Sequence, residues 1–266
     1  MTKAGTLANY EVEAQNLSRA SENKIHDDDV ARQFGFTGAL VPGVEVYAYA
    51  CHVPVEVWGR DWLDSGTIEC RFAKPVYDGR RVEVRAEPDR DALAISVESG
   101  GALCATATAR LGERSAPPPV VSYPVRPLPK ERPPADEVSL APGTWLGTCV
   151  RDMTPEDTGW YLDGVRETEP LYRSERIVHP GRILRLCNTA LMENVVLGPW
   201  IHVGSKVQHF ATARVGEALS IRARVAANYE KKGHRFVDLD ALVLANDARP
   251  IAHVLHTAIY RLRPPN

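Results

Sequence analysis

The feature that most constrains this chain is an internal repeat, because the same series of short patterns occurs twice in the same order. The matched pairs are GTIECRF at 66–72 with GSKVQHF at 204–210, VEVRA at 82–86 with LSIRA at 219–223, and TATARL at 106–111 with TAIYRL at 257–262. Several matches in one order are improbable by chance, so we expect one fold to be present twice. The second copy is longer, most simply through a hairpin at 228–234.

Each copy also has a helical segment ahead of its strands. Residues 44–58 are mostly apolar, as expected of a helix surrounded by protein, and apolar side chains recur every three or four residues from 183 to 195. The later strands alternate, with Val82 and Val84 on one face. This pattern predicts an α+β fold of two antiparallel sheets, each wrapped around a central helix, with helix N-termini at Gly43 and Gly181.

A proline-rich stretch separates the copies. Residues 117–134 read PPPVVSYPVRPLPKERPP, which cannot form a helix or a central strand. We therefore predict an N-terminal unit at 1–116, an extended surface linker at 117–137 and a C-terminal unit at 138–266.

Composition excludes several classes of protein. A net charge of −2 gives no global field for nucleic acid or an anionic membrane. No apolar run approaches a membrane span, and the N-terminus lacks the apolar core of a signal peptide. The five scattered cysteines contain no CxxC pair, which predicts small buried side chains in a reducing cytoplasm and neither disulfides nor a metal site. Exposed sheet edges make a homodimer plausible.

One stretch of the first copy carries a chemical signature. Residues 23–43 read NKIHDDDVARQFGFTGALVPG and resemble the motif of the MaoC-like hydratases, which include the (R)-specific enoyl-CoA hydratases. The matching positions are Asn23, His26, Ala31, Phe34, Gly35, Phe36 and Gly43. The resemblance implies a hotdog fold, here in a double form in which one chain replaces the family's dimer.

The resemblance also implies a reaction. The family adds water to a 2-enoyl thioester or removes it from a 3-hydroxyacyl thioester. His26 takes the place of the catalytic histidine, Asn23 that of a positioning amide, and Gly43 that of the glycine whose N–H binds the thioester oxygen at a helix N-terminus. The implied partner is an acyl-CoA or an acyl carrier protein, with coenzyme A only as part of the substrate and no separate cofactor. The acyl chain would lie between the central helices.

The departure from the motif is Ser21, which stands where the family has its catalytic aspartate. A serine holds no charge at neutral pH and is no base. The nearby run Asp27, Asp28 and Asp29 more simply caps the following short helix. Neither half therefore presents a complete acid and histidine pair.

The second copy matches the motif more loosely. Its candidate residues are Glu167, Tyr172, His179 and Gly181. Glu167 keeps an acid, Tyr172 replaces the histidine, and His179 borders the second helix N-terminus, which favours a functional position. His52 lies mid-helix and is expected to be structural. The remaining histidines show no ligand spacing, so strand or turn positions are expected for them. Arg80, Arg81 and Arg85 are weak candidates for binding coenzyme A phosphates, since a solvated strand face explains them better.

Three functions stay open. The leading hypothesis is an acyl-thioester hydratase or dehydratase, a hydro-lyase with an atypical active site. The second is a hotdog thioesterase that uses Glu167 or Glu45 to activate water. The third is a protein that binds an acyl or polyketide-like ligand without turnover. Its main support is the loss of the family's aspartate at Ser21.

Overall fold

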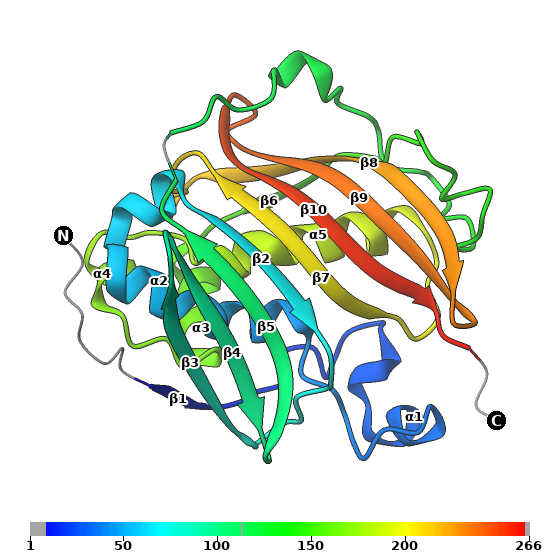
Figure 1. Cartoon of the computed structure of the whole chain (residues 1–266). Coiled ribbons are helices and arrows are strands. Elements are labelled where there is room, and N and C mark those ends of the chain that lie inside the picture. The colour runs from blue at the N-terminus through cyan, green and yellow to red at the C-terminus, as the bar shows by residue number, and fades with distance from the viewer. Residues whose placement is uncertain (1–8, 113, 264–266) are drawn as a thin grey trace.

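The computed structural model describes residues 9–112 and 114–263 (Figure 1). The first copy contains β1 (Tyr10–Glu13), a 3-10 turn (Lys24–His26), α1 (Asp28–Gln33), α2 (Gly43–Ser65), β2 (Thr67–Phe72), β3 (Arg81–Asp89), β4 (Ala92–Ser99) and β5 (Ala102–Arg110). The second contains β6 (Cys149–Asp152), α3 (Pro155–Gly164), α4 (Pro170–Ser174), α5 (Pro180–Asn194), β7 (Ile201–His209), β8 (Ala218–Lys231), β9 (His234–Ala245) and β10 (Arg249–Arg261).

The strands form one antiparallel sheet in the order β1-β3-β4-β5-β2-β7-β10-β9-β8-β6. This order is symmetric about its centre, because β2 corresponds to β7, β5 to β10 and β3 to β8, as the sequence matches predicted. The α+β fold class is confirmed. The two expected sheets join edge to edge through β2 and β7, where Ile68 faces Val207 and Cys70 faces Ser205. This join covers an edge that each half would otherwise expose.

Alternation decides which strand face is buried. In β3, Val82 and Val84 are fully buried while Arg81 and Arg85 lie on the outer face. The longer second hairpin is formed by β8 and β9, which are connected at Lys232 and Gly233. Both of these residues have positive φ, as a tight two-residue turn requires.

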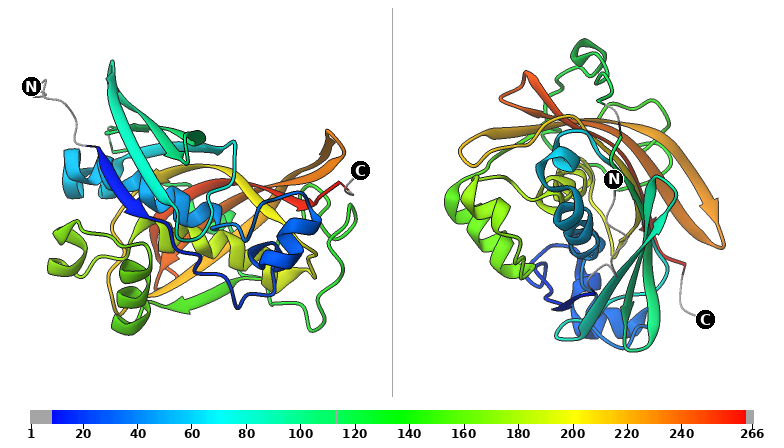
Figure 2. Two further views of the ribbon diagram at one scale, coloured as in Figure 1. Left: turned by 90° about the horizontal axis from the view of Figure 1, so that it is seen from below. Right: turned by 60° about the vertical axis from the view of Figure 1, so that its left-hand side comes forward.

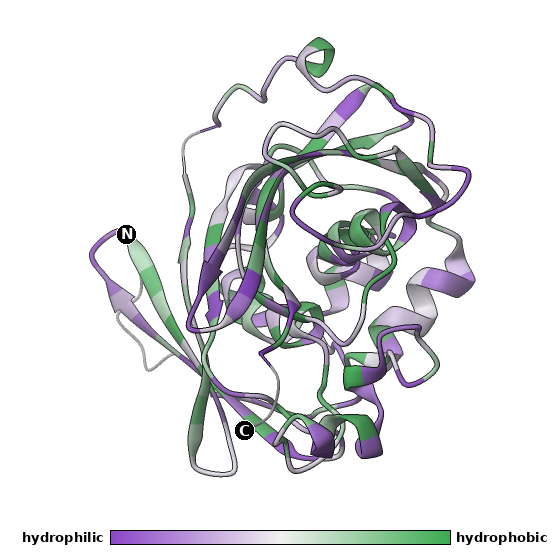
Figure 3. Ribbon diagram, turned by 90° about the vertical axis from the view of Figure 1, so that its right-hand side faces the viewer, coloured by the Kyte–Doolittle hydropathy of each residue, from purple (hydrophilic) through white to green (hydrophobic). Residues whose placement is uncertain are grey.

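The sheet curves around α2 and α5, which lie against each other on its inner face (Figure 2). The first half of α2 is buried on all sides, whereas α5 buries an apolar stripe. Hydrophobic stretches run along both helices and the inner strands (Figure 3). They lie close together at Gly181, where an added Cβ would stand 2.7 Å from the Ala48 Cβ. The helices of the two copies therefore share one core.

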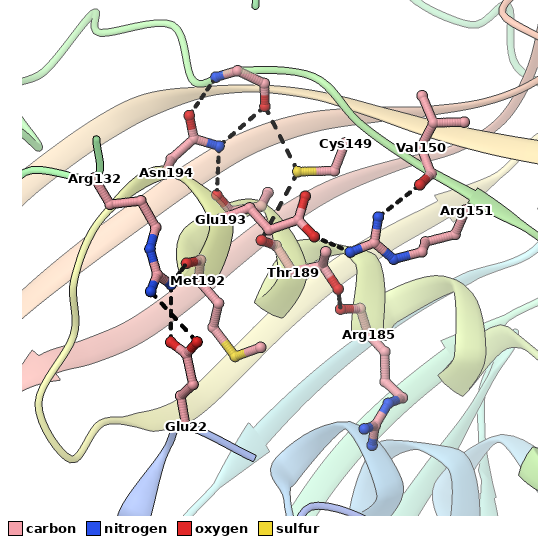
Figure 4. A network of polar contacts seen from close by, with 12 residues as sticks. Glu22, Arg132, Cys149, Val150, Arg151, Arg185, Thr189, Met192, Glu193 and Asn194 are labelled. Carbon is pink, nitrogen blue, oxygen red and sulfur yellow. Dashed lines mark hydrogen bonds and ion pairs between the residues drawn. The ribbon is translucent and has the colours of Figure 1, made fainter. Parts of the chain in front are cut away.

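The predicted linker follows the second copy closely. The Tyr123 hydroxyl donates to Asp240 at 2.6 Å. Arg132 donates to the Met192 carbonyl at 2.6 Å and to Glu22 at 2.9 Å, so it ties the end of α5 to the segment ahead of His26 (Figure 4). The linker is thus anchored, and it contains a short 3-10 turn at Val120–Ser122, so it is not extended throughout as predicted. The unit boundaries themselves stay a prediction.

Two expectations from composition concern the described residues. All five cysteines are unpaired and buried, as predicted. Among the helices described, none is long and apolar enough to cross a membrane.

Candidate functional site

Asn23 positions the motif by bonding to the second copy. It caps the 3-10 turn, because its Oδ1 accepts from the Ile25 N–H at 3.3 Å. The same oxygen accepts from the Trp200 N–H at 3.2 Å, and its Nδ2 donates to the Trp200 carbonyl at 2.9 Å. The amide therefore bonds to both backbone polar groups of Trp200, the residue just before β7. Asn23 is therefore a positioning residue between the halves.

The next motif residue, His26, is buried with its tautomer fixed. Its Nδ1 lies 2.7 Å from the Leu40 carbonyl oxygen, which can only accept, so Nδ1 carries the proton. Nε2 is left with a lone pair and lies 3.3 Å from the Asn23 amide nitrogen. Burial lowers the pKa of His26 to about 4, with the Arg185 charge adding to the effect and the Leu40 bond opposing it. The ring is neutral at pH 7 and presents Nε2 as an acceptor.

Gly43 begins α2 close to this ring. Among the residues described, no side chain caps this helix. The Glu45 N–H donates to the Pro42 carbonyl at 3.0 Å, so the N–H groups of Gly43 and Val44 are the ones left for a ligand. A Cβ at Gly43 would stand 2.9 Å from Nδ1 of His202 and 3.1 Å from the His202 carbonyl oxygen. Only glycine fits where the helix start meets β7.

Two adjoining cavities share the wall around Gly43. The smaller, of about 20 Å³, is lined by Asn23, His26, Asn188 and His202, among others. The larger, of about 300 Å³, is mostly apolar; its lining residues are Phe36, Leu40, Val41, Gly43, Val46, Phe72, Ala73, Lys74, Pro75, Val76, Ile201, His202, Val203, His234, Ile259 and Leu262. No carboxylate lines either cavity among the residues described. Ser21 lies outside both linings, and its hydroxyl donates only weakly to the Asn23 carbonyl, at 3.4 Å.

Several expectations about the surroundings need correction. The larger cavity is lined by strands, loops and the start of α2, with no residue of α5, so it does not run between the central helices. Arg81 and Arg85 pair with Glu11 and Glu83 on the outer face and line neither cavity. By contrast, the expectation that the aspartate run caps α1 is confirmed, since Asp27 accepts from the N–H of Asp29 and of Val30.

The second copy does contain an acid and histidine pair, contrary to the sequence prediction. Glu167 accepts from His52 Nδ1 at 2.7 Å and contacts His179 Nε2 at 3.2 Å. Burial raises the pKa of the Glu167 carboxyl, but the hydrogen bonds and charges of the two histidines outweigh it and hold that pKa well below its usual range. His52, expected to be merely structural, thus joins α2 to the second copy. Sequence alone misses this contact because the partners are 115 residues apart.

The second helix N-terminus is closed. The Gly181 N–H donates to His179 Nδ1 at 3.0 Å, so the histidine side chain caps α5. A Cβ at Gly181 would stand 2.3 Å from the Tyr161 hydroxyl. Tyr172, which takes the place of the histidine, packs against the His179 ring with centroids 4.6 Å apart. The side chains of His179, Tyr161 and Tyr172 therefore occupy the position in the second copy that corresponds to the site in the first.

Glu45, the other candidate acid, is also engaged. It lies fully buried in the first turn of α2 and pairs with Arg185 of α5. Burial raises the pKa of Glu45, and the Arg185 charge opposes that shift. Neither Glu45 nor Glu167 lines the cavities beside His26.

Comparison with known proteins identifies the architecture. No family model matches the chain, and no curated protein matches it in sequence. A structure from Chloroflexus aurantiacus described as a MaoC domain dehydratase covers 98% of this chain and 99% of its own, with a TM-score of 0.63 at 11% identity. A Mycobacterium tuberculosis protein described as a double hotdog covers 96% of both chains, with a TM-score of 0.60 at 16% identity. This chain is a double hotdog.

Activity does not follow from the double-hotdog fold. A structure from Novosphingobium aromaticivorans described as a thioesterase also covers 98% of both chains, with a TM-score of 0.55 at 13% identity. Dehydratases and thioesterases thus share this architecture, so the function must be argued from the site.

The double hotdog brings residues to the site that the sequence did not suggest. Asn188 on α5 and His202 on β7 line the small cavity with His26. His202 was expected only to occupy a strand, and nothing in the spacing of Asn188 marks it. Both come from the second copy, so only the packing of the copies places them here.

Proposed function

We propose that the N-terminal half binds an acyl thioester and adds water to its 2-enoyl form, or removes water from its 3-hydroxyacyl form. The observation that carries the proposal is the position of His26. His26 lines a small cavity that adjoins both the uncapped start of α2 and an apolar pocket, and its Nε2 is the ring nitrogen that carries no proton. A base, a helix N-terminus and an acyl pocket are what this reaction requires.

Each part has a separate task. The thioester oxygen accepts from the Gly43 N–H, where the helix dipole favours the charge that develops as the enolate forms. The acyl chain occupies the apolar pocket, whose volume of about 300 Å³ favours a short chain. Lys74 lines the same pocket and offers a charge to the phosphates of coenzyme A or of a carrier protein.

His26 moves the proton. In hydration, Nε2 takes a proton from water as the water oxygen bonds to the β-carbon and the double-bond electrons move toward the thioester. The protonated ring then returns that proton to the α-carbon. Nδ1 keeps its own proton throughout, because the Leu40 carbonyl accepts it. One H and one OH are added, and the base is regenerated.

The test is the hydration of crotonyl-CoA and longer enoyl-CoAs, measured as the loss of enoyl-thioester absorbance. We expect His26→Ala to lower kcat at least about a hundredfold, the usual contribution of a positioned base. Ser21→Ala is the matched control and should keep the wild-type rate, since Ser21 lines neither cavity. Equal rates for wild type and His26→Ala would refute the role of His26.

A second function is favoured by one observation: no carboxylate of the described part of the chain lines either cavity. It is acyl-thioester binding without turnover, and saturable binding with no product over the same panel would establish it. Thioesterase activity is less favoured, because Glu45 and Glu167 are bound to partners. Release of free thiol would identify it, since hydration releases none.

A further inference from the structure

The small cavity beside His26 is the size of one water molecule. A single water needs roughly 10–15 Å³ of such space, and this cavity offers about 20 Å³. Its polar lining comes from both copies, with Asn23 and His26 from the first and Asn188 and His202 from the second. A water there has the two to four polar partners that a buried water requires.

Two of the lining side chains carry an unsatisfied acceptor. Asn188 Oδ1 and His202 Nδ1 are buried, and neither has a hydrogen-bond partner among the residues described. Buried acceptors are normally satisfied, since leaving one unpaired is costly. Their shared position at one cavity points to a donor that both would use, and a water molecule is the donor that fits.

The tautomer of His202 supports this assignment. Its Nε2 lies 3.0 Å from the Gly204 carbonyl oxygen and 2.8 Å from the Ser205 hydroxyl. The carbonyl can only accept, so Nε2 carries the proton and Nδ1 presents a lone pair. Burial lowers the pKa of His202 to about 3, so the ring stays neutral at pH 7. His202 is thus a fixed acceptor next to Gly43.

We propose that Asn188 and His202 orient the reacting water against His26, in place of the carboxylate that Ser21 does not supply. This inference rests on the proposed hydratase or dehydratase function. The water donates one hydrogen to His26 Nε2, where it replaces the 3.3 Å contact with the Asn23 amide nitrogen, and Asn188 Oδ1 and His202 Nδ1 share the other. Its oxygen then has a lone pair left for the β-carbon of the substrate. Asn188 and His202 position the water and take no proton.

The family motif has an aspartate where this chain has Ser21, and the resemblance implies that this carboxylate acts as both acceptor and base. Neutral acceptors such as Asn188 and His202 only orient the water. His26 must then carry the proton alone, which is consistent with its fixed tautomer. The missing function of Ser21 is supplied across the interface between the copies.

Asn188→Ala tests the proposal in the full-length protein. We expect kcat for enoyl-CoA hydration to fall about tenfold or more while KM changes less than about twofold, because the acceptor acts on water and not on substrate binding. Asn188→Asp keeps an acceptor oxygen and should recover most of the lost kcat. Thr189→Ala, the neighbouring position on α5, is the control and should match wild type. A wild-type kcat in Asn188→Ala would overturn the proposal.

A high-resolution crystal structure separates this inference from the proposed function. We expect an ordered water within hydrogen-bond distance of His26 Nε2 and of Asn188 Oδ1 or His202 Nδ1, lost or displaced in Asn188→Ala. A dry cavity in the wild type would overturn the water site whatever the activity. Failure of the wild type to hydrate any enoyl-CoA, with the water present, would refute the hydratase function and leave the site as a structural water.

Discussion

At the scale of single residues, Asn23 shows how much one amide can fix. It satisfies the N–H of Ile25 and both the N–H and the carbonyl of Trp200, a residue 177 positions away. The family resemblance assigned it the place of a positioning amide. The structure gives it a role in joining the copies, which the motif alone does not reveal.

Asn23→Ala should therefore destabilise the protein by about 2–3 kcal/mol, since it leaves buried backbone groups of Trp200 without partners. The measurement is urea unfolding, where the midpoint should fall with little change in slope. Asn23→Asp retains the acceptor and should cost less than Asn23→Ala. An unchanged midpoint for Asn23→Ala would show that these hydrogen bonds make no net contribution to the free energy of unfolding.

At the scale of elements, the two central helices have the same place in the fold but different N-termini. α2 begins at Gly43 without a side-chain cap, whereas α5 begins with His179 bonded to the N–H of Gly181. A capped terminus has its orphan N–H satisfied by protein and offers it to no ligand. The start of α2 is thus open to the proposed ligand, whereas the start of α5 is capped by protein.

Glycine substitutions should separate these roles. Gly181→Ala forces a Cβ against Tyr161 and Ala48 and should cost about 1–3 kcal/mol of stability, while kcat per folded molecule stays near wild type. Gly43→Ala pushes against the His202 ring and backbone beside the cavities, so kcat should fall sharply. Thermal unfolding and enoyl-CoA hydration measure the two effects. The same loss of kcat in both variants would contradict the assignment.

At the scale of the whole molecule, the shared core holds several buried neutral histidines. Burial lowers the pKa of His26 and of His209 to about 4, of His202 to about 3, and that of His256 well below its usual value. Unfolded histidine titrates near pH 6.5, so between about pH 6.5 and pH 4 the unfolded state binds more protons than the folded state. Stability must fall as the pH falls through this window.

We expect the melting temperature to drop steadily from pH 7 to pH 4. His209→Gln should flatten that drop, because it removes a group that must be buried uncharged and that lines neither of the two cavities around Gly43. Glu167 adds to the acid sensitivity only below about pH 4.5, since the pKa of this group is lowered in the fold. Calorimetry over a pH series measures the effect, and a flat profile for the wild type would refute it.

The sequence by itself determined the repeat, the alternating strands, the two apolar helices and the position of the His26 motif. These features depend on periodicity and on patterns that extend over fewer than about thirty residues, so they are visible without the fold. The matched segments also predicted which strands of the two copies correspond, whereas the order of the strands in the sheet came from the structure.

Only the tertiary structure decided how the copies share a site. The β2–β7 join, the contact of His52 with Glu167, and the arrival of Asn188 and His202 beside His26 all link residues far apart in the chain. Spacing along a sequence carries no record of such contacts, because they follow from packing two apolar helices inside one curved sheet. The sequence motif identified the histidine, whereas the packing of the two copies determined which residues surround it.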